Sequence, residues 1–147
     1  MKRLIAITMA FASLFGCELN NNNLSSSDWY LRSEITWWEA KPEYKLEPNK
    51  DETLLVTSFY MEPDGQEYHI KITDKVLSRE KNCGISREDQ RTLRLNQWFP
   101  LNCQFQGDEV MPLAMGYQFT PESKSKIMLE VRLVNGQPYE LRLRAVP

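Results

Sequence analysis

The sequence predicts an all-β fold, an antiparallel β-sandwich of about seven to eight strands. Three observations predict it. From residue 29 onward, apolar and polar residues alternate over short runs, which is the period of a half-buried strand. Turn-forming residues separate these runs. No stretch after residue 28 carries an apolar stripe of helical spacing. We therefore expect one β-sandwich domain over residues 29–147.

Residues 1–28 precede this domain and divide into two parts. Met1-Lys2-Arg3 leads into an apolar run that ends at Gly16-Cys17. A basic start followed by about 7–15 apolar residues is typical of an export signal. The run is shorter than the ~20 residues of a spanning helix, so a signal peptide over residues 1–16 is favoured over a transmembrane anchor. Residues 17–28 are rich in Asn and Ser and predict a flexible tether.

Leu14-Phe15-Gly16-Cys17 resembles the lipobox of bacterial lipoproteins, in which a leucine, a small residue and a glycine or alanine precede the cysteine. Phe15 is larger than the usual residue. The resemblance implies cleavage before Cys17, acylation of its thiol and its amine, palmitate among the lipids, and attachment to the membrane through this residue. In that family an Asp after the cysteine favours the inner membrane. The resemblance therefore implies a lipid-anchored protein of the bacterial cell envelope that faces the periplasm, and Glu18, which stands in place of that Asp, favours the outer membrane.

Charge and composition exclude several classes of function. The chain has a formal net charge of −2, and residues 1–16 hold two basic residues and no acidic one, so the rest carries −4. Nucleic-acid binding needs an excess of Lys and Arg and is not expected. No metal or other cofactor is expected, because His69 is the single histidine and the sequence has no Cys-x-x-Cys pair.

The first expected strand begins at Trp29. In the first run, Trp29, Leu31 and Ile35 lie on one side, and Arg32 and Glu34 lie on the other. Trp29 is therefore expected in the core. Similar alternation or β-rich composition marks the remaining strand candidates, which are residues 44–46, 54–61, 67–72, 93–95, 116–120, 127–134 and 139–143.

Two pairs of these runs predict β-hairpins. Residues 54–61 and 67–72 flank a strong turn signal, Pro-Asp-Gly, and are expected to pair through a turn at residues 62–66. The last two runs flank Asn135-Gly136, which is the favoured dipeptide of a type I′ turn.

A long polar interval covers residues 74–90, and Cys83 lies within it. With Cys17 assigned to lipid, Cys83 and Cys103 remain as an even pair in an exported protein, which predicts a disulfide bond. Two free buried thiols are the alternative. A disulfide would tie down an interval longer than most loops.

Several segments together resemble a known kind of domain. They are Trp29-Tyr30-Leu31-Arg32, Tyr44-Lys45-Leu46, residues 67–74 (Glu-Tyr-His-Ile-Lys-Ile-Thr-Asp) and Gly116-Tyr117-Gln118-Phe119-Thr120-Pro121. Their order is similar to that of the early-set, immunoglobulin-like modules of bacterial pullulanases and of related glycogen- and starch-binding modules. The resemblance spans most of residues 29–145 at low density, and it implies the same β-sandwich class.

The resemblance also implies a glycan site. Trp38 takes the position of a tryptophan that stacks on a glucose ring, and Lys71 takes that of a lysine that bonds sugar hydroxyls. Trp37 is a second candidate contact, because exposed tryptophans usually serve recognition. The sequence departs from the family at three places: Ser33 replaces a glycine, Thr36-Trp37 replaces Asn-Gly, and Val76-Leu77 replace a second stacking aromatic.

Catalytic residues are not predicted. The sequence has no Gly-x-Ser-x-Gly motif, its acidic residues fall mostly in turn-like segments, and His69 reads as a solvent-facing strand residue. Trp98 reads as a core residue beside Cys103, with a ligand platform as the alternative. We therefore expect a non-catalytic lipoprotein that binds glycan or assists a carbohydrate-handling system. The alternative is an assembly or structural lipoprotein that binds an envelope protein through the same tryptophans.

Overall fold

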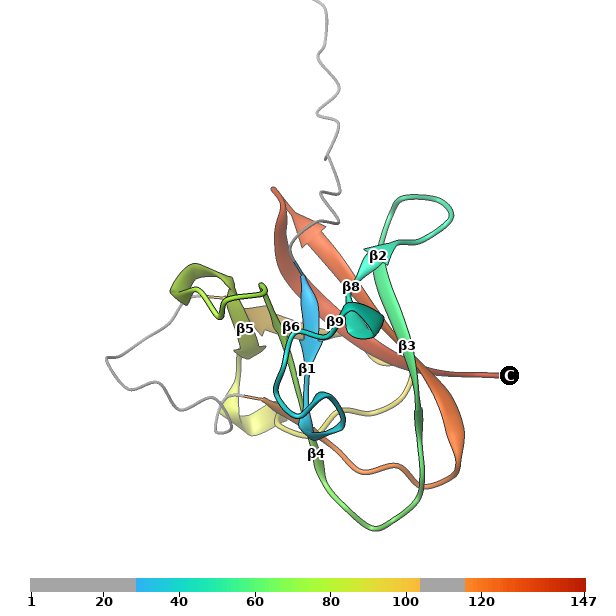
Figure 1. Ribbon diagram of the computed structural model, residues 1–147. Coiled ribbons are helices and arrows are strands. Elements are labelled where there is room, and N and C mark those ends of the chain that lie inside the picture. Colours follow the sequence, from blue (N-terminus) through green and yellow to red (C-terminus); the bar gives the residue numbers. More distant parts are fainter. Residues whose placement is uncertain (1–28, 104–115) are drawn as a thin grey trace, which may run out of the picture.

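The computed structural model of the protein describes residues 29–103 and 116–147 (Figure 1). These residues form nine β-strands joined by turns and short 3-10 helices, and no α-helix is found among them. The predicted all-β fold is confirmed. The signal peptide, the tether and Cys17 lie outside the described residues, as does the segment 104–115, so the domain boundaries stay predictions.

The elements follow one another along the chain with short connections. The strands are β1 (Tyr30–Arg32), β2 (Glu47–Pro48), β3 (Leu55–Met61), β4 (Tyr68–Thr73), β5 (Asn82–Ile85), β6 (Phe99–Asn102), β7 (Tyr117–Phe119), β8 (Ser125–Val134) and β9 (Gln137–Val146). The 3-10 helices are η2 (Glu34–Thr36), η3 (Pro42–Tyr44), η4 (Arg79–Lys81) and η5 (Glu88–Gln90).

Strand pairing links all nine strands into one curled sheet. Its order is β1-β4-β5-β6-β9-β8-β3-β2, β7 pairs with β4, and every pairing of named strands is antiparallel. Because the sheet curls, alternate residues of its strands face inward and form one apolar core. Trp29 belongs to this core, as predicted. Phe99 on β6 packs edge-on against Tyr117 on β7, with ring centroids 5.6 Å apart.

The predicted hairpin at Asn135-Gly136 is confirmed. β8 and β9 pair over nearly their whole length, from Lys126 opposite Val146 to Val134 opposite Gln137. Asn135 and Gly136 have φ angles of 52° and 76°, and positive φ at both central residues is what a type I′ turn requires.

The other predicted hairpin is wrong. β3 pairs with β2 and β8, whereas β4 pairs with β1, β5 and β7, so residues 62–67 carry the chain between two parts of the sheet. The turn itself is ordered by Asp64, whose carboxylate accepts the Gln66 N–H at 2.9 Å and the Tyr68 hydroxyl at 2.6 Å. Alternation shows that each strand buries one face, and it does not specify which strand pairs with which.

The predicted disulfide bond between Cys83 and Cys103 is present. Gly84 pairs with Asn102 in the β5–β6 ladder, so the bond joins Cys83 of β5 to the residue directly after β6. The two cysteines are 20 residues apart in the sequence. The long polar interval is thereby held near its middle, by the disulfide at Cys83 and by the pairing of β5 with β4 and β6.

Candidate functional site

The two predicted contact tryptophans lie in one tight turn after β1. Ser33 and Thr36 brace this turn: the Ser33 N–H donates to Thr36 Oγ1 at 3.1 Å, and that hydroxyl donates back to the Ser33 carbonyl at 3.0 Å. The backbone N–H of Trp37 donates to the Glu34 carbonyl and that of Trp38 to the Ser33 carbonyl, each at 3.0 Å. The turn is therefore fixed by its own hydrogen bonds.

Trp37 and Trp38 both adopt left-handed backbone conformations, with φ angles of 57° and 60°. This region is unfavourable for a bulky residue by about 1–2 kcal/mol. Trp37 stands where the resembling modules carry glycine, the residue that adopts this conformation most easily. Its side chain is 78% exposed, whereas Trp38 is partly buried. The turn thus holds an indole in solvent at a position where the backbone favours glycine.

Arg32 joins this turn to a second one. The Arg32 guanidinium is buried and donates to the backbone carbonyls of Trp38, of Asp74 at 3.4 Å and of Lys75 at 2.9 Å. Its Nε donates to Thr73 Oγ1 at 3.0 Å. Burial lowers the pKa of Arg32, and the charge of Asp74 opposes that shift. One side chain therefore fixes the backbones of both turns against each other.

The second turn follows β4 and exposes two apolar side chains. The Asp74 carboxylate holds it by accepting the backbone N–H of Ser78 at 2.8 Å and the hydroxyl of the same residue. Val76 is 78% exposed and Leu77, with a φ of 57°, is 40% exposed. These are the positions where the resembling modules place a second stacking aromatic. We call Trp37, Trp38, Val76 and Leu77 the two-turn surface.

His69 braces the first turn from β4. Its Nδ1 lies 2.8 Å from Glu34 Oε1, and its backbone N–H donates to Glu34 Oε2 at 2.7 Å. The predicted solvent-facing position is thus only partly correct, because the side chain is half-buried. The residue connects η2 to β4.

Lys71 is not part of the exposed surface. It lies opposite Arg32 in the β1–β4 register and is only 2% exposed. Burial, with a further contribution from the charge of Arg32, lowers the pKa of Lys71 to about 8. The structure therefore brings Trp37 and Trp38 together with Val76 and Leu77, and it leaves the ammonium of Lys71 inside the domain. The carry-over to Lys71 followed strand position, which does not report burial.

The core position expected for Trp98 is wrong. Trp98 is partly exposed, and the guanidinium carbons of Arg132 and Arg142 lie 3.9 and 4.3 Å from its ring centroid. Arg142 also pairs with the buried carboxylate of Glu130, with Nε 2.7 Å from Oε2. The ring is occupied by these two arginines on the solvent side of β8 and β9, so it is not a free stacking platform.

The described residues form neither a metal-binding cluster nor a membrane-spanning helix. Among the described residues, no group of three or more His, Cys, Asp and Glu side chains is arranged to hold a metal ion. Over residues 29–103 and 116–147, no helix has the length and apolar character needed to cross a membrane.

Comparison with known proteins supports the fold class. No protein-family model matches the chain, and no curated protein matches it. Among solved structures, the chain is similar to the ligand-induced structure of AmyP-SBD, a starch-binding domain. The TM-score is 0.53 at 12% sequence identity, over 100% of this chain and 96% of that chain. The protein therefore has a β-sandwich fold like that of a carbohydrate-binding domain.

Proposed function

We propose that this protein is a non-catalytic lipoprotein of the cell envelope whose β-sandwich binds glycan through the two-turn surface. The observation that carries the proposal is Trp37, a tryptophan exposed to solvent in a left-handed backbone conformation. Backbone strain of this kind concentrates at functional sites. The likeness of the fold to a starch-binding domain supports a glycan as the ligand.

In this proposal the Trp37 indole stacks on the apolar C–H face of a sugar ring. The hydrogen bonds of Ser33, Thr36 and Arg32 fix the turn before the ligand arrives. Little conformational entropy is then lost on binding. Val76 and Leu77 offer further apolar area on the second turn, in place of an aromatic ring.

Affinity electrophoresis of the full chain in detergent, in gels containing amylose, tests the proposal. Trp37→Ala should weaken retardation about tenfold or more, since truncating a central aromatic contact costs ~2 kcal/mol. Tyr60→Ala is the matched control, because Tyr60 is 70% exposed but lies on β3, outside the two-turn surface. Soluble β-glucans and peptidoglycan fragments extend the test, and a wild-type protein that binds none of these glycans would refute the proposal.

Val76 and Leu77 favour a second candidate function, the binding of a protein partner in the envelope. Their exposed aliphatic side chains beside a tryptophan turn resemble the apolar centre of a protein interface. Photo-crosslinking from position 76 in intact cells tests this function. A discrete adduct that disappears with Trp37→Ala is expected, and recovery of free monomer alone would argue against it.

The lipid anchor is proposed from the lipobox resemblance at Cys17. Metabolic labelling with a palmitate analogue should mark the wild-type chain and leave Cys17→Ser unmarked. Two acyl groups or more give stable membrane attachment, so the wild type should sediment with membranes and the variant should not. Labelling of Cys17→Ser at the wild-type level would rule out this residue as the anchor.

A further inference from the structure

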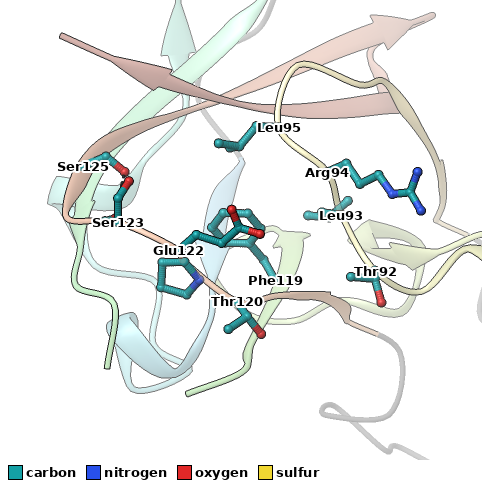
Figure 2. A pocket seen from close by; sticks show the side chains of 10 residues that line it. Thr92, Leu93, Arg94, Leu95, Phe119, Thr120, Glu122, Ser123 and Ser125 are labelled. Atoms are coloured by element: carbon teal, nitrogen blue, oxygen red, sulfur yellow. Dashed lines mark hydrogen bonds between the residues drawn. The ribbon is translucent and has the colours of Figure 1, made fainter. Parts of the chain in front are cut away.

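A hollow lies outside the two-turn surface, between residues 92–95 and residues 119–125 (Figure 2). Its volume is about 440 Å³, within the range of small-molecule sites. Leu93 and Phe119, both buried, and the partly exposed Leu95 give it an apolar lining. None of its lining residues belongs to the two-turn surface.

Polar groups surround this apolar lining. Four hydroxyl side chains contribute to the walls, those of Thr92, Thr120, Ser123 and Ser125. Glu122 projects its carboxylate into the space between the two segments (Figure 2).

The charged groups of this hollow balance each other. Arg94 lies on the far side from Ser123 (Figure 2). Within the described part of the chain, the side chains of Arg94 and Glu122 form no hydrogen bond or ion pair with another residue. Their charges cancel, so the hollow favours neither an anion nor a cation.

A second hollow of about 690 Å³ adjoins the first and shares Thr92 and Arg94 with it. Its lining includes three glutamines, Gln90, Gln97 and Gln118, together with the oppositely charged Asp89 and Arg91. Amides and hydroxyls both donate and accept hydrogen bonds, as the hydroxyls of a sugar do. Arg94 therefore stands between two adjoining hollows with similar hydrogen-bonding chemistry.

We propose that a neutral glycan chain binds across residues 92–94, along the groove that the two adjoining hollows form, with Arg94 donating to and Glu122 accepting from its hydroxyl groups. A pyranose ring matches the first hollow, because it combines an apolar C–H face with hydroxyls that both donate and accept. Longer chains extend into the second hollow over Arg94. The glycan class rests on the proposed function, but the contact surface and its residues are separate from it.

Titration calorimetry of the full chain in detergent tests the proposal, with maltoheptaose, laminarihexaose and cellohexaose as probes. For the probe that binds, Arg94→Ala and Glu122→Gln should each weaken affinity about tenfold, because the first removes a charged donor and the second replaces a charged acceptor with a neutral one. Lys50→Ala is the control, as it removes an exposed charge at a distant turn. Unchanged thermal unfolding midpoints verify that the variants are folded.

Trp37→Ala, measured beside these variants, separates this inference from the proposed function. If Trp37→Ala weakens binding while Arg94→Ala and Glu122→Gln behave like Lys50→Ala, the groove is not a glycan site and the two-turn surface stands. If only the groove variants weaken binding, the groove stands and the two-turn surface falls. If no probe binds the wild type, the groove is overturned as a site for neutral glycans, and the two-turn surface falls with it only if peptidoglycan fragments also fail to bind.

Discussion

Lys71 and Arg32 face each other from neighbouring strands, and both are buried. The pKa of Lys71 is lowered from 10.5 to about 8 by burial and by the charge of Arg32. Between these two pH values the unfolded chain holds a proton that the folded chain has released. The free energy of unfolding therefore increases as the pH rises from about 8 to 10.5, and the full penalty of charging Lys71 applies below pH 8.

Lys71→Met should consequently stabilise the domain at pH 7, by about 2 kcal/mol, since it replaces a buried ammonium with an apolar side chain of similar length. It should also remove the rise in stability between pH 8 and 10.5. Urea unfolding at pH 7, 8, 9 and 10 measures both effects. Lys50→Met, an exposed change, serves as the control, and equal pH slopes for wild type and Lys71→Met would contradict the prediction.

The left-handed conformation of Trp37 has its own consequence. Trp37→Gly should be more stable than Trp37→Ala, by about 1 kcal/mol, because glycine enters that region without strain. At Tyr60, within β3, the order should reverse, with glycine less stable than alanine. Thermal unfolding midpoints of the four variants, with glycine and alanine at each of the two positions, test both orders. Equal stability of the two Trp37 variants would mean that the turn relaxes once the indole is gone.

At the scale of elements, local chemistry was predictable and pairing partners were not. Asn135-Gly136 specifies its turn by itself, so the β8–β9 hairpin follows from the sequence. The Pro-Asp-Gly turn before β4 suits a hairpin and a crossing between different parts of the sheet equally well. The partners of β3 are distant in sequence, and nothing local identifies them.

The same limit applies to the candidate sites. The sequence marks the tandem tryptophans, but the burial of Lys71 and the carbonyl contacts of Arg32 depend on how β1 and β4 pair. The groove beside Arg94 is formed by two segments that are more than twenty residues apart in the sequence, so no local motif predicts it.

The turn that carries Trp37 is held by hydrogen bonds between Ser33 and Thr36, and their contribution can be tested. Thr36→Val removes the hydroxyl that accepts from the Ser33 N–H and donates to the Ser33 carbonyl. Stability should fall by about 1 kcal/mol, and affinity for the glycan should fall with it, because the turn is no longer fixed before binding. Thr53→Val, at an exposed turn, is the control. Loss of stability with full affinity would show that the turn needs no bracing.

At the scale of the whole molecule, the disulfide between Cys83 and Cys103 closes a loop that ordinary strand pairing also holds. Reduction should lower the free energy of unfolding by roughly 3 kcal/mol, through the larger freedom of the unfolded chain. Urea unfolding with and without reductant measures this, and thiol labelling verifies that the bond has opened. An unchanged midpoint after full reduction would contradict the prediction.

The pairing of β3 with β8 joins positions such as Phe59 and Ile127, roughly seventy residues apart. A chain emerges from the ribosome N-terminus first, so β3 is complete long before β8, the later of its two partners, exists. Its inner face, with Leu55, Phe59 and Met61, must wait uncovered until the C-terminal hairpin arrives. The domain therefore completes its fold only after the last two strands have been synthesised. A truncation that removes β8 and β9 leaves β3 with an exposed apolar face that is prone to aggregate, and does not leave a smaller folded domain.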